Sequence, residues 1–224
     1  MFRFFLKLIF FCVIVGTPYL YFQQKLMAKN DAFYWKSTHK AGTLIIGGSR
    51  AFKGIAPHVL KKELSINTEV LNLAFIGTLS PYGKAYYDLI KRKIDHSSPE
   101  LHRFILSVNP GLVMDYEGEK TPREASFGFY KLWFVNIDPN LEYVFRHPRK
   151  GKSLLVAIEN EFSRSRIGRK IFQDGYSATF FPKGINTFNT IQREKLLKYD
   201  FVYSTEREDY LLKTVEYLSQ LGPI

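Results

Sequence analysis

The stretch Thr43–Pro57, TLIIGGSRAFKGIAP, decides how the rest of the chain is interpreted. Its first residues, Thr43–Ile46, form a short and uninterrupted apolar run rich in β-branched side chains, which predicts a buried strand. Gly47 and Gly48 follow and allow a sharp turn where a side chain would clash. Ser49 comes directly after this turn. Because open α/β sheets carry their chemistry at the C-terminal ends of their strands, we predict that Ser49 is a nucleophile or derives from one.

The strand–turn–helix pattern repeats along the chain. Apolar runs that end in turns predict two more strands, and apolar spacing with Pro or Ser at the start predicts the helices. Repeated strand, turn and helix units of these lengths predict an α/β domain with a mainly parallel sheet. The further predicted strands are Val70–Phe75 and His102–Val108, and the predicted helices are Pro57–Leu64, Ser80–Ile94 and Ser204–Leu221.

The pattern is looser between Met114 and Lys198. Short helices are expected at Phe127–Val135 and Leu154–Phe162, and Ser177–Lys183 is either a loop or a short strand. After the last helix, Gly222-Pro223-Ile224 is typical of a helix end that leads into another strand. We therefore expect the domain to be incomplete at its C-terminus.

The composition of the chain limits the classes of protein to which it can belong. The 224 residues suit one domain plus a short appendage, and a hydrophobic fraction of 46% excludes a disordered chain. The net charge of +11 suits an anionic neighbour such as lipid head groups or an acidic envelope polymer, although a basic solvated surface explains it as well. No nucleic-acid-binding motif accompanies the charge, so no nucleic acid partner is expected. Cys12 is the single cysteine, and neither a metal nor another cofactor is implied.

The N-terminal segment predicts a membrane anchor. Phe4–Phe22 is apolar over about the 20 residues that a spanning helix needs, with Lys7 near one end and Tyr19 near the other. No small-residue cleavage site follows, which favours an uncleaved signal anchor over the alternative of a cleaved signal peptide. The predicted organisation is an anchor at residues 1–24, a juxtamembrane spacer at 25–40 and an α/β domain at 41–224. Lysines beyond the anchor draw that domain towards the cytoplasm by charge alone.

Three turns at the ends of the predicted strands define a candidate site. They contain Ser49, Gly77 and Asn109, and turns at the same end of neighbouring parallel strands converge on one crevice. Ser49 is placed to attack an acyl carbonyl. The backbone N–H groups of Ser49 and Gly77, with the Asn109 side-chain amide, are then candidates for an oxyanion hole, in which each donor lowers the barrier by about 3–4 kcal/mol.

The motifs at these turns resemble those of a known superfamily. Gly-Gly-Ser-Arg at 47–50, Asn-Leu-Ala-Phe-Ile-Gly at 72–77 and Val-Asn-Pro at 108–110 resemble blocks I, II and III of the SGNH/GDSL hydrolases. The chain looks most similar to the membrane-anchored bacterial branch that includes DltD-like D-alanyl-transfer proteins and alginate O-acetylation proteins. The resemblance implies a flavodoxin-like three-layer SGNH fold, with Ser49 as nucleophile and Ser49, Gly77 and Asn109 as the oxyanion hole. It covers roughly residues 40–115.

The resemblance also implies a function and a location. It implies a serine esterase or O-acyltransferase acting on an acylated envelope glycan or another envelope ester, with a membrane-bound acyltransferase as a candidate partner. It favours the periplasmic or extracellular side for the domain, against the charge count. The family's Asp-x-x-His pair is missing, because no histidine follows His147. The expected place for that base is beyond Ile224, and the alternative is a non-catalytic, membrane-tethered partner of an acyltransferase system.

Each candidate residue also has a plainer structural interpretation. Ser49 is a favoured type for a helix N-cap or an ordinary turn residue, and Asn109 before a proline is a common strand terminator. Arg50 is a weak candidate for contacting an anionic substrate, and a surface salt bridge is the commoner role. Asp174 lies in an Asp-Gly turn signal, and His58 is expected to pack or to face solvent rather than to bind a metal.

Overall fold

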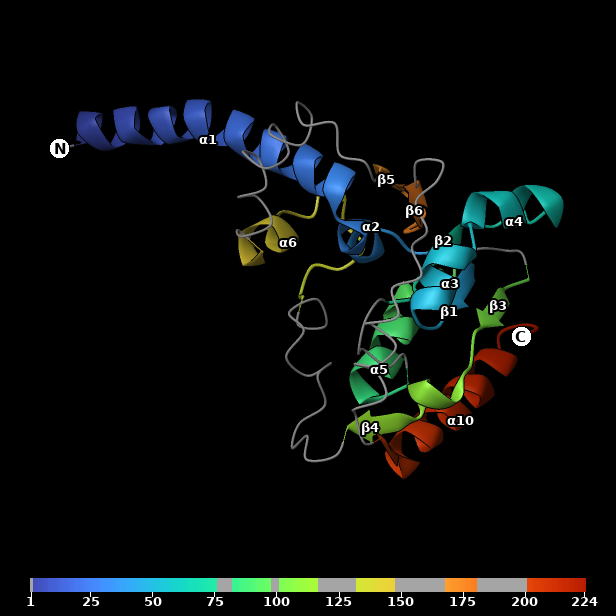
Figure 1. Ribbon diagram of the computed structural model, residues 1–224. Helices are drawn as coiled ribbons and strands as arrows, with labels where there is room; N and C mark the ends of the chain where they lie inside the picture. The colour runs from blue at the N-terminus through green and yellow to red at the C-terminus, as the bar shows by residue number, and fades with distance from the viewer. Residues whose placement is uncertain (1, 76–81, 98–100, 117–131, 148–167, 181–200) are drawn as a thin grey trace.

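The computed structural model describes residues 2–75, 82–97, 101–116, 132–147, 168–180 and 201–224 of the chain (Figure 1). These residues form a mixed α/β structure with a small parallel sheet. A single long helix, α1 (Phe2–Asn30), precedes the sheet and extends away from it. The predicted α/β class is therefore confirmed for the described part of the chain.

The parallel sheet places the candidate site. It consists of β1 (Thr43–Ile46), β2 (Val70–Asn72) and β3 (Arg103–Leu106) in the order β2-β1-β3, with both pairs parallel. Thr43 is paired with Val70 on one side and with Arg103 on the other, so the three strands start at the same level. All three predicted strands are confirmed, although β2 and β3 are shorter than the apolar runs that predicted them.

Hydrophobic residues cover both faces of β1, as its uninterrupted apolar sequence requires. Leu44 and Ile46 belong to the larger core cluster, whereas Ile45 belongs to a second cluster on the opposite face. The larger cluster includes residues of α5 (Lys84–Lys93) and α10 (Thr205–Ser219), and the second includes residues of α3 (Ser49–Gly54). Partly buried Leu60 packs on that second cluster from α4 (Pro57–Glu63). The sheet therefore has helices on both faces.

The helices follow the predicted pattern in part. Helix α4 begins at Pro57, and α10 begins after Ser204 with Glu206 and Glu208 in its first turn, which favours the helix dipole. The predicted helix at Ser80–Ile94 corresponds to α5. Helix α3 was not predicted, because its six residues are too few to show helical periodicity.

The segment expected as a polar spacer contributes to the core instead. Residues 25–30 continue α1, and Ala32–Thr38 form α2, whose N-terminus is capped by the Asp31 side chain on Phe33 N–H at 3.1 Å. Tyr34 and Trp35 of this helix are buried. The buried Lys93 ammonium donates to the carbonyl oxygens at the end of α2, and this bonding joins α2 to α5.

Two small antiparallel pairs complete the described strands. β4 (Met114–Tyr116) pairs with β7 (Phe201–Tyr203), and β5 (Gly168–Ile171) forms a hairpin with β6 (Ser177–Phe180). The stretch Ser177–Lys183, predicted as a loop or a strand, is thus a strand over its described residues. The short 3-10 helix η1 (Pro110–Leu112) follows β3.

The helix predicted at Phe127–Val135 is wrong for its described residues, 132–135, which adopt no helix. The physical reason is that the Glu142 carboxylate takes the N–H groups of Trp133 and Phe134, at 3.1 and 2.6 Å, in place of helical carbonyls. The nearby helix, α6, lies at Leu141–Arg146 and is capped by Asn140. The helix predicted at Leu154–Phe162 lies outside the described residues.

The C-terminal residues lie along the free edge of β3. Phe104 N–H donates to Pro223 O at 3.0 Å, so Gly222-Pro223-Ile224 runs beside the strand rather than away from it. A residue with a side chain at Gly222 would place its Cβ 2.0 Å from His102 O, which explains the glycine at this close approach. This contact places the C-terminal residues at the edge of the sheet, although they form no strand there.

Helix α1 divides into an exposed part and a packed part. By length and composition, Phe2–Lys29 is apolar enough to cross a membrane, and its most apolar stretch is not buried by the described protein. Towards the C-terminal end, Gln23 and Met27 are buried, and Leu20 packs against the core. Helix α1 therefore packs against the rest of the described structure through its C-terminal end.

Candidate functional site

The ends of the three parallel strands meet at Gly47. Phe75 N–H, just beyond β2, donates to Gly47 O at 3.0 Å, and Ser107 N–H, just beyond β3, donates to Ile46 O at 2.8 Å. Gly47 has a φ of +156°, and a Cβ on it would lie 2.7 Å from Ser107 Cβ. Only glycine fits this close approach, which agrees with the predicted sharp turn.

Ser49 is exposed directly above this meeting point. It is the first residue of α3, and Gly48, rather than Ser49, occupies the N-cap position. The interpretation of Ser49 as a helix N-cap is therefore wrong. Its hydroxyl group makes no hydrogen bond with the described residues, so it is available to a ligand.

Asn109 lies on the neighbouring turn. It is half-buried, and its side chain caps nothing, although its backbone oxygen accepts Leu112 N–H at 2.9 Å in η1. A Cβ on Gly48 would lie 3.1 Å from Leu112 Cδ2, so η1 packs directly against the turn that precedes Ser49. The structure thus brings the Ser49 and Asn109 turns together at one edge of the sheet.

The structure gives less information about the other two predicted site residues, Gly77 and Arg50. Gly77 lies outside the described residues. Arg50, the second residue of α3, is exposed and forms no ion pair within the described part of the chain, so the predicted surface salt bridge is absent there.

No histidine is bonded to Ser49. All five histidines lie in the described residues, and those that form hydrogen bonds form them elsewhere. His39 contacts Gln173 O at 3.3 Å, His102 contacts Gly42 O at 3.2 Å, and His147 contacts Tyr143 O at 3.1 Å. His96 packs edge-on against His102. In the described part of the chain, Ser49 therefore has no histidine bonded to it.

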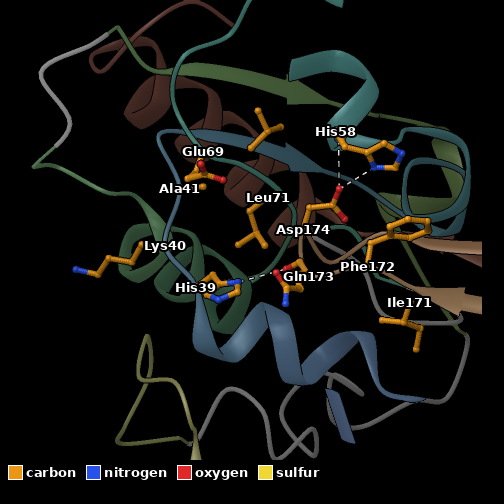
Figure 2. A pocket seen from close by; sticks show the side chains of 11 residues that line it. His39, Lys40, Ala41, His58, Glu69, Leu71, Ile171, Phe172, Gln173 and Asp174 are labelled. Carbon is orange, nitrogen blue, oxygen red and sulfur yellow. Dashed lines mark hydrogen bonds and ion pairs between the residues drawn. The ribbon is translucent and has the colours of Figure 1, made fainter. Parts of the chain in front are cut away.

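A histidine–carboxylate pair is present elsewhere, at the start of α4. His58 Nδ1 lies 3.0 Å from Asp174 Oδ2, and the His58 ring stacks on Phe172 (Figure 2). The same carboxylate also accepts His58 N–H at 3.3 Å and Tyr176 N–H at 3.0 Å, so it satisfies a free donor at the start of α4 and closes its own turn. Neither residue is bonded to Ser49, which begins α3, whereas His58 belongs to the following helix, α4.

The pair lines a cleft of about 710 Å³. The cleft lies between the edge strand β2 and the β5–β6 hairpin, where Asp174 O accepts Asn72 N–H at 2.8 Å. In Figure 2, His39 and His58 approach the cleft from different elements, and Asp174 lies between Leu71 and His58. No third ligand-type side chain joins the pair among the residues that the structure describes, so a metal site is not formed there. Ser49 does not line the cleft.

Sequence reasoning missed this pair for a clear reason. His58 and Asp174 are 116 residues apart, and neither lies in a recognisable motif. The Asp-Gly turn signal at 174–175 predicted the turn correctly but not the role of its carboxylate. Gly175 itself is required, because its φ is +77° and a Cβ would lie 2.6 Å from Asn72 O.

Asn72 fixes α3 relative to the sheet. Its side-chain nitrogen donates to Ala51 O at 3.0 Å and to Ile55 O at 2.9 Å, and its side-chain oxygen accepts Ala74 N–H at 3.1 Å. Asn72 is fully buried, so each of these bonds replaces contact with water. This asparagine, at the end of β2, therefore positions the helix that begins with Ser49.

Lys36 lies beneath the same region. Its fully buried ammonium group donates to Ala74 O and lies 4.5 Å from the centre of the Phe52 ring and 5.2 Å from that of Phe75. Burial lowers the pKa of Lys36 well below its usual value, and the attraction of Asp174 and Asp31 opposes this only in part. Its contacts with Ala74 O and with the two rings join α2 to the core beneath the strand ends.

Comparison with models of protein families, with curated proteins and with solved structures found no match for this chain. Assignment of the site consequently depends on its geometry and on the motifs at the three turns.

Proposed function

We propose that this chain is a membrane-anchored SGNH-type serine esterase or O-acyltransferase, in which Ser49 accepts the acyl group of a cell-envelope glycan or a related envelope ester. The observation that carries the proposal is the exposed, unbonded hydroxyl of Ser49 at the C-terminal end of the central strand. Open parallel sheets bind their ligands at this edge. The adjacent Asn109 amide, which caps nothing, is available to a developing oxyanion.

The chemistry assigns a separate role to each residue. Ser49 Oγ forms a bond to the acyl carbonyl carbon, and its proton passes to a base. The carbonyl oxygen becomes an oxyanion that the Ser49 and Gly77 N–H groups and the Asn109 amide stabilise. The C–O bond to the sugar then breaks, and the sugar oxygen leaves with a proton. Water or a second hydroxyl releases the acyl group in the next step.

A second candidate function is favoured by a specific observation. No histidine among the described residues is bonded to Ser49, and a serine hydroxyl without a base is a poor nucleophile at neutral pH. This observation favours a non-catalytic partner that keeps the fold and the anchor and assists a membrane-bound acyltransferase. In that case Ser49→Ala leaves the cellular function intact, whereas removal of α1 abolishes it.

A fluorophosphonate probe distinguishes the two functions, because it forms a covalent bond only with an activated serine. The full chain in detergent is expected to be labelled, and Ser49→Ala is expected to lose the label. Ser219→Ala, at an exposed serine of α10, is the matched control and should label like the unaltered chain. An unlabelled chain, or a label that survives Ser49→Ala, excludes the acyl-enzyme role.

Asn109→Ala tests the oxyanion role separately. Loss of one oxyanion donor slows labelling by about 10²–10³-fold when the donor acts in the transition state. The Asn109 side chain caps nothing, so the midpoint of thermal unfolding should be nearly unchanged. Equal labelling rates for the variant and the parent chain would remove Asn109 from the site.

Sidedness is part of the same proposal. We place the domain on the periplasmic or extracellular side, as an envelope substrate requires. A protease added outside intact spheroplasts is then expected to digest the domain, and protection until the cells are lysed would place it in the cytoplasm instead.

A further inference from the structure

Large apolar side chains are concentrated on one exposed segment outside α1. Residues 132–147 carry an aromatic patch, defined as Trp133 (82% exposed), Phe134 (61%), Ile137 (47%), Leu141 (41%) and Phe145 (64%). The patch surrounds a hollow of about 690 Å³. A contiguous apolar surface of this kind marks a contact with another phase or another molecule.

The patch is held against the C-terminal part of α1 and the start of α2 by half-buried and exposed polar contacts. Tyr143 OH donates to Asp31 Oδ2 at 2.7 Å, and Gln24 Nε2 donates to Asp138 Oδ1 at 3.4 Å. Tyr34 OH donates to the same Asp138 oxygen at 3.1 Å. In Figure 1, α6 lies alongside α1, back towards the N-terminus from α2, and not beyond the end of the helix. The position of the patch along the axis of α1 is therefore fixed.

That position corresponds to a membrane surface. Phe4–Phe22 spans roughly 28 Å at 1.5 Å per residue, close to the thickness of a hydrocarbon core. Gln24 lies two residues beyond Phe22, about 3 Å further along the axis. Since Asp138 is bonded to Gln24, the loop that carries Ile137 lies at the level of the lipid head groups when α1 crosses a bilayer.

The local chemistry suits this interface. Trp and Phe are preferred where acyl chains meet head groups. Glu142 binds the backbone N–H groups of Trp133 and Phe134, so these donors are already satisfied next to an apolar phase. Its own charge is paired with Arg146 at 2.8 Å. Lys25, exposed on α1 next to Gln24, is placed to contact lipid phosphates.

We propose that the aromatic patch inserts into the head-group region of the same bilayer that α1 crosses, giving the domain a second membrane contact. A single helix permits the domain to rotate about it, whereas two contacts set the orientation of the domain to the membrane. The inference rests on the membrane anchor in the proposed function and is independent of the chemistry of Ser49.

The two tryptophans provide a direct test, because Trp133 is exposed and Trp35 is in the core. The full chain with Trp35→Phe is reconstituted into phosphatidylcholine–phosphatidylglycerol vesicles, with and without lipids brominated near the head group. Trp133 emission is expected to fall several-fold with brominated lipid. In the matched Trp133→Phe chain, Trp35 emission should be nearly unchanged.

A second measurement leaves Trp35 in place, in case its replacement disturbs the core. A nitroxide is attached at Phe145→Cys in a Cys12→Ser background, with Leu212→Cys on α10 as the control of similar exposure. We expect lipid-soluble oxygen to relax the label at 145 and a water-soluble nickel complex to relax the label at 212.

The results separate the possible occupants of the patch. Contact with lipid at both Trp133 and Phe145 supports the proposal. Contact with water at both overturns it, and so does protection from both water and lipid, which would show that a second copy or another protein covers the patch. Ser49 labelling is unaffected by either result, so failure of the serine chemistry and failure of the membrane contact are distinguishable.

Discussion

Replacement of Lys36 by methionine tests the energetics of the core beneath the candidate site. The lysine is fully buried among Phe33, Phe52 and Phe75 and has one acceptor, Ala74 O. Methionine has a similar volume and no charge, so it removes the titration with little change in packing.

The sign of the pH effect follows from the direction of the pKa shift. In the unfolded chain Lys36 has an ordinary pKa of 10.5, and burial lowers it well below this in the folded chain. Between the two values, only the unfolded chain holds the proton, so the free energy of unfolding rises with pH. The slope approaches about 1.4 kcal/mol per pH unit for one such group.

Lys93 adds a second contribution of the same sign. Burial lowers its pKa well below the usual value, and Arg92 and Lys40 lower it further. The limiting slope for both groups is therefore about 2.7 kcal/mol per pH unit, and Lys36→Met should reduce it by about half. Loss of the contacts of the ammonium group changes the free energy of unfolding by the same amount at each pH, so it does not change the slope.

The measurement is urea unfolding of the full chain in detergent, followed by Trp35 emission in a Trp133→Phe background, between about pH 8 and about pH 9.5. The upper limit avoids tyrosine ionisation, because an unfolded tyrosine titrates near pH 10 whereas burial raises the pKa of Tyr34 to about 12. Lys53→Met, at an exposed lysine of α3, is the control and should keep the full slope. If Lys36→Met and Lys53→Met give the same slope, the burial argument is refuted.

Three further predictions concern the turns and caps that position the site and the aromatic patch. Gly47→Ala is expected to lower the free energy of unfolding, measured by urea unfolding, by more than about 2 kcal/mol, because its Cβ would overlap Ser107. The control is Gly54→Ala, which should leave the free energy of unfolding unchanged because no atom lies within 4 Å of its Cβ. Asn72→Leu should cost about 2–5 kcal/mol by the same assay and lower the rate of fluorophosphonate labelling, because it frees α3 from the sheet. Asn140→Ala removes the cap of α6 and should cost about 1–2 kcal/mol, with reduced protection of the patch from water in the vesicle assays as its second readout.

The sequence predicted the features that depend on neighbouring residues. The apolar run at Thr43–Ile46 predicted both bounds of β1, and Pro57 predicted the start of α4. The Gly47-Gly48 pair predicted the turn that raises Ser49 above the sheet. In each case the same few consecutive residues show the pattern and produce the structure, through burial of a strand or through the fixed φ of proline.

Features that depend on distant partners were not predictable. Lys36 is one of five charged residues that make residues 25–40 appear polar, yet the fold buries this lysine among aromatic rings supplied by three different segments. Asp174 meets His58 only because the β5–β6 hairpin docks on the edge of β2. Nothing within a short window of sequence signals either contact, so composition and periodicity cannot reveal them.

The candidate site contains two kinds of residue, and they support a function to different degrees. The glycine at position 47 is required by the packing of strand ends, so its presence in the motif is explained without any reaction. Ser49 and Asn109 differ, because neither side chain caps a helix and the Ser49 hydroxyl is unbonded in the described structure. Both side chains lie at the C-terminal edge of a parallel sheet, the edge at which open α/β sheets bind their ligands, so both are candidates for contact with a ligand. For this reason, substitutions at Ser49 and Asn109 test the function of the protein, whereas those at Gly47 and Asn72 test the structure that holds it.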